Sequence, residues 1–148
     1  MRGAAEVARD WLGTPYVHQA SVRGAGTDCL GLIRGVWRDV CGAEPEVVPP
    51  YTADWSEPQR REALWQAAER WLVPVSDGRA LQSGEVLLFR MRQNAVAKHL
   101  GIVGRTGPAP TFIHAYSGRA VMESSLSRSW RRRIAARFDF PSIAAKED

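Results

Sequence analysis

The chain has 148 residues, of which 45% are hydrophobic and 24% are charged, and its net charge at pH 7 is +4. This composition excludes a disordered or fibrous chain and predicts one domain, residues 1–148, with a single moderate core. The charged N-terminal stretch is not a secretory signal, and no stretch has the roughly 20 apolar residues that a spanning helix needs. We therefore expect synthesis in the cytoplasm without a signal peptide and no membrane insertion.

Apolar residues at helical spacing predict a first helix over residues 4–12. Residues 13–27 mix glycine, proline and polar residues and predict a loop. A second helix is expected to begin at Thr27 as its N-cap and to run to about Cys41. Cys29 then lies in the first turn of this helix, at the margin of its buried stripe.

The following stretch, residues 42–55, contains two adjacent prolines and predicts an irregular connection. A third helix is expected in "SEPQRREALWQAAERWL", with Ser56 as its cap and Gln59 closing a capping box. After Gly84 the pattern changes from helical to alternating. Strands are predicted at about 85–91, 99–104, 111–116, 119–124 and 134–140. Helices followed by an antiparallel meander indicate an α+β domain, with N-terminal helices packed on a C-terminal sheet of about five strands.

Two of the predicted strands form a hairpin that carries two histidines. With Thr106 and Gly107 at its tip, His99 lies directly opposite His114, and cross-strand neighbours on one face have Cβ atoms about 4.5–5.5 Å apart. A slip of one residue would send the two rings to opposite faces of the sheet. Gly101, on the same face as His99, leaves space for another element to approach.

The thiol of Cys29 is expected near these rings. A helix N-terminus favours a thiolate, and a nearby imidazolium favours it further, whereas the carboxylate of Asp28 disfavours it. A single cysteine or histidine in such a place is usually structural. Three such residues in compatible positions predict a Cys–His–His site for nucleophilic catalysis.

The two cysteines are not expected to pair. Twelve residues along one helix would separate Cys29 and Cys41 by about 18 Å, whereas a disulfide needs Cα atoms within roughly 7 Å. Cys41 is most simply a packing residue. His18 lies close to Tyr16 in the predicted loop, and we expect it on the surface or at the rim of a substrate site.

Other functions remain open from the residues alone. Cys29, His99 and His114 are acceptable zinc ligands, but the sequence has neither a CxxC nor an H-E-x-x-H motif, which favours a site without metal or cofactor. The basic run "RSWRRRIAAR" is typical of a solvated surface and suits an anionic partner. It is not part of a recognised nucleic-acid module, so no specific nucleic-acid binding is expected.

The segments "TDCLGL", "GEVLLF", "HLGIVG" and "FIHAY" follow one another in an order that resembles the NlpC-type cell-wall cysteine peptidases. These are papain-like peptidoglycan hydrolases of bacteria, and the resemblance covers nearly the whole chain. It implies that Cys29 is the nucleophile, His99 the base and His114 the residue that orients the base. Tyr16 matches the tyrosine of the family's early P-Y segment, near the nucleophile.

The resemblance also implies a mechanism, a substrate and a setting. Cys29, as a thiolate paired with His99, would attack a stem-peptide carbonyl. The backbone N–H of Cys29 and the Tyr16 hydroxyl would bind the oxyanion, and Asp28 belongs to the same oxyanion and substrate-binding group. The expected bond joins γ-D-glutamate to meso-diaminopimelate. The short chain is most similar to the peptidases of phage tails and gene transfer agents, which implies tail-hub or tail-tip partners and action in the periplasm or cell wall.

Two departures from the family pattern affect this interpretation. Leu30 follows the cysteine where the family usually has serine, and "HQASVRGAGTD" replaces a shorter loop with paired glycines. Both changes bear on substrate preference. The alternative is a non-catalytic plug or adaptor of a phage-like tail, built on an inactive peptidase fold.

Overall fold

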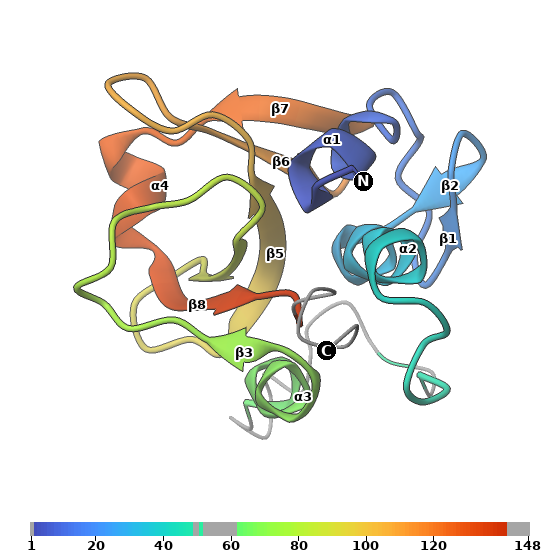
Figure 1. Cartoon of the computed structure of the whole chain (residues 1–148), viewed down its shortest axis with the longest axis horizontal. Helices are drawn as coiled ribbons and strands as arrows, with labels where there is room; N and C mark the ends of the chain where they lie inside the picture. Colours follow the sequence, from blue (N-terminus) through green and yellow to red (C-terminus); the bar gives the residue numbers. More distant parts are fainter. Residues whose placement is uncertain (1, 49–50, 52–61, 142–148) are drawn as a thin grey trace.

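The computed structural model describes residues 2–48, 51 and 62–141. Its helices are α1 (Ala4–Arg9), α2 (Cys29–Val40), α3 (Ala63–Trp71) and α4 (Arg128–Arg132). A small hairpin is formed by β1 (Ser21–Val22) and β2 (Gly26–Thr27). The main sheet contains β3 (Val73–Pro74), β4 (Val86–Arg90), β5 (Ala97–Val103), β6 (Thr111–Ala115), β7 (Val121–Ser125) and β8 (Ile134–Asp139). Figure 1 shows α2 and α4 on opposite sides of this sheet.

The main sheet has the order β3-β8-β4-β5-β6-β7, and all its pairs are antiparallel. The α+β class and the five predicted strands are confirmed, but the sheet has a sixth strand. The additional strand, β3, has only two residues and contains Pro74, so it has no alternating pattern and occupies an edge. Two further elements were not predicted: the hairpin β1–β2 lies in the expected loop, and α4 lies in the basic run.

The helix bounds differ from the predicted ones at their ends. Helix α1 ends at Arg9, and α2 is capped by Asp28, whose side chain accepts a hydrogen bond from the Gly31 N–H, instead of by Thr27. Helix α3 begins at Ala63, and the predicted cap Ser56 lies outside the described residues.

The hairpin of β5 and β6 has a register two residues away from the predicted one. Ile102 pairs with Ile113 and Val103 with Phe112. A shift of two residues preserves the face to which each side chain points, so the two histidines still share a face. The space above Gly101 is filled from within the sheet, because a Cβ there would lie 2.8 Å from the Phe112 ring.

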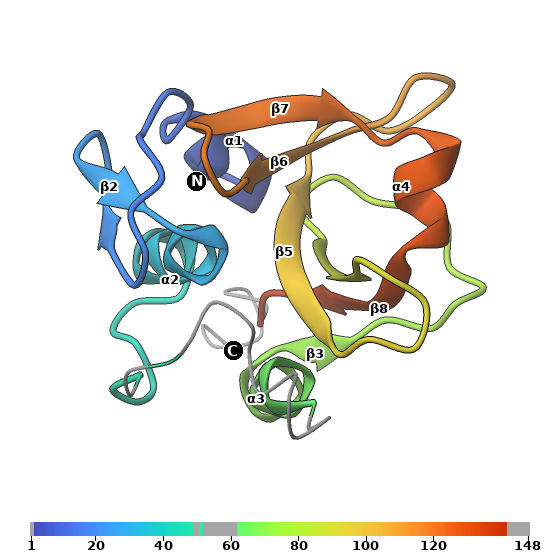
Figure 2. The ribbon, with the colours of Figure 1, turned by 180° about the vertical axis from the view of Figure 1, so that it is seen from behind.

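Buried side chains form two clusters, one on each face of the sheet. The first packs α1, α2 and α3 against side chains such as Leu88, Leu100 and Ile102. The second lies on the side of α4 and consists of Leu87, Phe89, Val103, Phe112 and Leu126. Figure 2 shows from behind how the strands curve around the side that α4 covers. No helix within the described residues is both long and apolar enough to cross a membrane.

The packing of Trp11, just after α1, on α2 depends on Gly35. A Cβ at this position would overlap the Trp11 ring, so Gly35→Ala should lower the free energy of unfolding by about 1–3 kcal/mol through overpacking. This loss is expected even though alanine is intrinsically the better helix former. Chemical denaturation measures the change.

The matched control is Gly78→Ala, because a Cβ at Gly78 meets no atom within 4 Å. This variant should unfold within about 0.5 kcal/mol of the wild type. Equal stability of the two variants would contradict the close packing of Gly35 on Trp11.

Candidate active site

Asp28 fixes the beginning of α2 and therefore the position of the thiol. Its Oδ1 accepts a hydrogen bond from the Gly31 N–H at 2.7 Å, and its Oδ2 accepts one from the Gln19 N–H at 2.7 Å. The side chain is buried, so these bonds replace water at the carboxylate. Cys29 follows directly as the first residue of the helix.

The thiol of Cys29 lies against the backbone of β5. Its Sγ is 3.8 Å from the carbonyl oxygen of Lys98, the residue that precedes His99. Strand β6 pairs with β5 only at Ile102 and Val103, so the backbone edge of β5 near His99 is available to the first turn of α2. Cys29 is buried and belongs to the cluster between the helices and the sheet.

The predicted thiolate is not favoured in this structure. Burial first, and then the neighbouring Asp28 carboxylate, raise the pKa of the Cys29 thiol to about 12; the effect of Asp28 is in the direction expected from the sequence. The backbone N–H groups of Leu100 and Leu30 act in the opposite direction but do not compensate. Burial therefore outweighs the helix N-terminus, and the thiol is neutral near pH 7.

The two histidines form a hydrogen-bonded pair. The distance from His99 Nε2 to His114 Nδ1 is 2.8 Å, and His114 Nε2 lies 2.9 Å from the Ser124 hydroxyl. Burial lowers the pKa of His114 to about 4, and burial together with the neighbouring His114 lowers the pKa of His99 to about 3. Both rings are neutral near pH 7, so one nitrogen of each donates and the other accepts.

Aromatic side chains surround this pair on the side of α4. His99 packs against Phe89, Tyr116 and Trp130, with ring centroids 5.5–5.7 Å apart. Trp130 also contacts His114, at 5.4 Å. Neither Trp130 nor Ser124 was predicted in the site. Trp130 lies in a run that the sequence predicts as surface, and Ser124 has no distinguishing pattern.

The structure thus brings the two histidines together and brings the thiol to the backbone beside His99. It does not join the thiol to a ring: no hydrogen bond links Cys29 Sγ to either imidazole, although all three residues are described. His99 Nε2 is used by His114, and Nδ1 of the same ring has no hydrogen-bond partner within the described residues. The catalytic roles of the three residues remain predictions.

Two tyrosines lie close to the thiol. Tyr16 packs against the cluster that contains Cys29, and burial first, then Cys29 and Asp28, raise its pKa to about 12. The Tyr51 hydroxyl donates a hydrogen bond to Asp28 Oδ2, and burial followed by this bond raises the pKa of Tyr51. Tyr51 was not predicted in the site, because it lies in an irregular connection without periodicity.

His18 lies at the outer edge of this group. Its Nδ1 is 3.8 Å from Asp28 Oδ2, and its ring meets the Tyr51 ring edge-on with centroids 5.2 Å apart. The side chain is 40% exposed.

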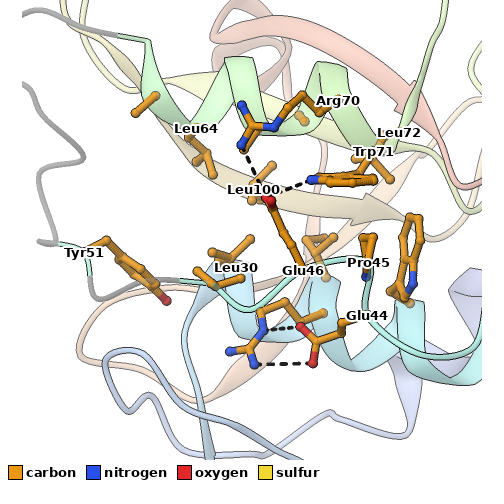
Figure 3. A pocket seen from close by; sticks show the side chains of 17 residues that line it. Leu30, Glu44, Pro45, Glu46, Tyr51, Leu64, Arg70, Trp71, Leu72 and Leu100 are labelled. Atoms are coloured by element: carbon orange, nitrogen blue, oxygen red, sulfur yellow. Dashed lines mark hydrogen bonds and ion pairs between the residues drawn. The ribbon is translucent and has the colours of Figure 1, made fainter.

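A cavity of about 270 Å³ lies between α2, α3 and residues 44–48 with Tyr51 (Figure 3), and Cys29 is not among its lining residues. Leu30, the residue that departs from the family pattern, lines it together with Leu100 and Leu64. Its polar groups are paired with one another, because Arg34 binds Glu44, and Glu46 accepts hydrogen bonds from Arg70 and Trp71. Within the described residues, no three His, Cys, Asp or Glu side chains come together to hold a metal ion.

No sequence profile of a known family matches the chain, and no curated protein matches it by sequence. Solved structures do match it. The NlpC/p60 domain of the peptidoglycan hydrolase SagA is 20% identical, with a TM-score of 0.58, over 93% of this chain and 97% of that domain. The chain has the NlpC/P60 fold. This match also confirms the predicted papain-like class.

Two further NlpC/P60 proteins have similar structures. One, from Staphylococcus aureus and described as similar to lipoprotein, is 20% identical with a TM-score of 0.57, over 92% of this chain and 41% of that protein. The other, from Bacillus cereus, is also 20% identical with a TM-score of 0.57, over 90% of this chain and 39% of that protein. This NlpC/P60-fold chain therefore spans about two fifths of the length of each of these two proteins.

The buried histidine pair predicts that the fold loses stability in mild acid. The unfolded chain binds protons with the ordinary histidine pKa of 6.5, whereas the pKa values in the folded protein are about 3 and about 4. As the pH falls from 7 to 5, the free energy of unfolding should decrease, approaching about 1.4 kcal/mol per pH unit for each histidine that gains a proton on unfolding. Urea denaturation at several pH values measures the slope.

His99→Gln should reduce this pH dependence, whatever its effect on stability at pH 7. Gly78→Ala is the control and should keep the wild-type slope, because it leaves both buried histidines in place and its Cβ meets no atom within 4 Å. A slope that is the same in wild type and His99→Gln would show that His99 is not held neutral in the folded protein.

Proposed function

We propose that the chain is a cysteine hydrolase that cleaves amide bonds in the stem peptides of bacterial peptidoglycan. The observation that carries this proposal is the hydrogen-bonded pair of His99 and His114 next to Cys29 at the start of a helix. The NlpC/P60 fold supports it, since the similar SagA domain belongs to a peptidoglycan hydrolase.

Because Cys29 and His99 are both neutral, the proton is transferred from the thiol to the imidazole during the attack, and no thiolate–imidazolium pair forms beforehand. His99 Nδ1 has no hydrogen-bond partner among the described residues, and it accepts the thiol proton as Cys29 Sγ attacks the carbonyl carbon. The resulting imidazolium gives this proton to the departing amine, which leaves an acyl-enzyme. His99 then takes a proton from water, whose hydroxide cleaves the thioester and releases the carboxylic acid, and the proton returns to the thiol.

Two other groups support these steps. His114 binds the far nitrogen of His99 and is itself bound to Ser124, so it fixes the orientation and the tautomer of the base. The backbone N–H of Cys29 and the Tyr16 hydroxyl stabilise the oxyanion. Tyr16 keeps its proton over the working pH range because its pKa is raised to about 12.

The finer features of the function follow from the resemblance to the NlpC-type peptidases. The bond cleaved is that between γ-D-glutamate and meso-diaminopimelate, and the enzyme acts in the periplasm or cell wall. A phage-like tail delivers it, with hub or tip proteins as its partners. Leu30 stands where the family usually has a polar residue after the cysteine, and it lines the apolar cavity. The site therefore accepts an apolar group of the substrate there.

One observation favours the alternative of a non-catalytic plug or adaptor. The thiol of Cys29 is buried, neutral and not hydrogen-bonded to an imidazole. A purely structural domain could retain such a thiol, whereas an enzyme must bring it to His99 when the substrate binds. Turnover by the purified protein separates the two functions.

The variant Cys29→Ala should release no stem-peptide fragments from purified sacculi, because the sulfur forms the acyl-enzyme. The products are identified by mass spectrometry of defined muropeptides, which also determines the bond cleaved. Cys41→Ala is the control: this thiol lies at the end of α2, where its Sγ is 3.9 Å from the Pro141 carbonyl oxygen, and turnover should be unchanged. Cleavage by Cys29→Ala at the wild-type rate would overturn the proposed mechanism, and no cleavage by the wild type would favour the plug.

Tyr16→Phe should lower kcat by about 100- to 1000-fold and leave KM nearly unchanged, since the hydroxyl acts on the oxyanion and not on the bound substrate. Single-turnover measurements on a muropeptide substrate give both constants. Tyr116→Phe is the control, because this tyrosine packs on the imidazoles from the side of α4. A kcat for Tyr16→Phe close to that of the wild type would remove Tyr16 from the oxyanion site.

A further inference from the structure

The positive charge that lacks a carboxylate partner is concentrated on α4. Most other arginine side chains in the described residues form ion pairs, for example Arg9 with Glu123, and Arg137 with Glu85. Other such arginines are Arg2, Arg23, Arg34, Arg38, Arg70, Arg79 and Arg90. Arg105 and Arg119 lie singly in the β5–β6 and β6–β7 turns, exposed and without a carboxylate partner among the described residues. By contrast, Arg128, Arg131 and Arg132 lie on one helix, are exposed and have no carboxylate partner in the part of the chain that the structure describes.

These three arginines line one shallow groove of about 670 Å³, here called the α4 groove. Its opposite wall is the segment Pro108–Ala109–Pro110 from the turn between β5 and β6. Ser125, Leu126 and Ser127 form the part between the two walls. The groove therefore combines a cationic wall, an uncharged wall of proline and alanine, and hydroxyl groups between them.

Helix α4 holds these arginines in fixed positions. Ser127 caps the helix, and Trp130 packs against Phe89 and Phe112, with ring centroids 5.2 and 5.0 Å apart. Leu126, just before the cap, is buried in the second cluster, and its N–H donates a hydrogen bond to the Pro110 carbonyl. The two walls of the groove are thus tied together, which reduces the entropy lost when a partner binds.

We propose that the α4 groove binds an acidic polypeptide segment in extended conformation. Guanidinium groups bind carboxylates in bidentate geometry, and removal of the repulsion among three like charges adds to the binding. Residues three and four apart on a helix have Cβ atoms about 5–6 Å apart, and alternate side chains on an extended peptide lie about 7 Å apart on one side. One acidic residue can therefore reach Arg128 while another, two positions away, reaches Arg131 or Arg132, and the apolar residue between them packs on the proline wall.

None of the proposed catalytic residues lines this groove, although α4 also carries Trp130, which packs on His99 and His114 from inside. The groove is lined by α4 residues, whereas Cys29 and Leu30 belong to α2. Figure 1 shows α2 and α4 on opposite sides of the sheet. The inference does not rest on the proposed hydrolase function. A phosphate polymer would satisfy the arginines alone and leave the proline wall without contacts, so the combination of walls favours a polypeptide.

The test measures binding of a short fluorescent peptide of alternating glutamate and alanine, by anisotropy at low and at physiological salt. The triple variant R128Q/R131Q/R132Q should raise Kd by about tenfold or more at low salt and should reduce the dependence of Kd on salt. The matched control R2Q/R23Q/R119Q removes the same charge from other exposed positions and should bind almost as the wild type does. Equal losses in the two triple variants would show attraction by net charge alone and would overturn the proposal.

A second variant leaves the arginines in place. Ala109→Glu adds a negative charge to the opposite wall of the groove and should weaken peptide binding without changing α4, as circular dichroism and thermal unfolding would show. Unchanged binding by Ala109→Glu would place the peptide outside the groove. Inorganic polyphosphate of equal charge is the competitor: tighter binding of polyphosphate than of the peptide would overturn the assignment to a polypeptide.

Discussion

Strand β5 has buried side chains on both of its faces, and the arrangement of the site depends on this constraint. Leu100 and Ile102 pack toward the helices, whereas His99 and Val103 pack toward the second cluster. A strand in this position cannot slip by one residue without placing imidazole among aliphatic helical contacts and leucine among the aromatic rings. The alternation therefore fixes where the imidazole ring lies, and the cap at Asp28 fixes where the thiol meets the strand.

Burial on this strand also decides the charge state of the site. Cys29 and His99 are nearly inaccessible to solvent, and each would lose hydration on becoming charged. A thiolate–imidazolium pair would need a contact close enough to replace that hydration, and the described structure has no thiol–imidazole hydrogen bond. The pair of neutral histidines is instead satisfied by its own hydrogen bonds to each other and to Ser124. This is a resting arrangement in which a proton can move only when the sulfur reaches His99 Nδ1.

The sequence predicted the features that follow from periodicity and failed on those that follow from tertiary packing. Alternating patterns encode the α+β class, the five predicted strands and the shared face of the two histidines. The predicted register of the β5–β6 hairpin was wrong by two residues, because turn geometry sets the register and side-chain alternation does not. Strand β3 and helix α4 are too short to show a period. Tyr51 reaches Asp28 from an irregular segment, and the high pKa of the Cys29 thiol depends on burial, which local sequence does not report.

Helix α4 shows how one short segment can serve two surfaces. Trp130 packs inward on the histidine pair, and Arg133 stacks on the Trp130 ring with its guanidinium 5.5 Å from the ring centroid. The remaining arginines of α4 face solvent, so the basic run predicted to be solvated surface is also a cover of the imidazoles. Because the same five residues make both contacts, a partner that moved α4 would change the packing around His99 and His114. The α4 groove and the proposed catalytic pair are thus connected through the Trp130 indole and through the cluster of Leu126 and Phe112.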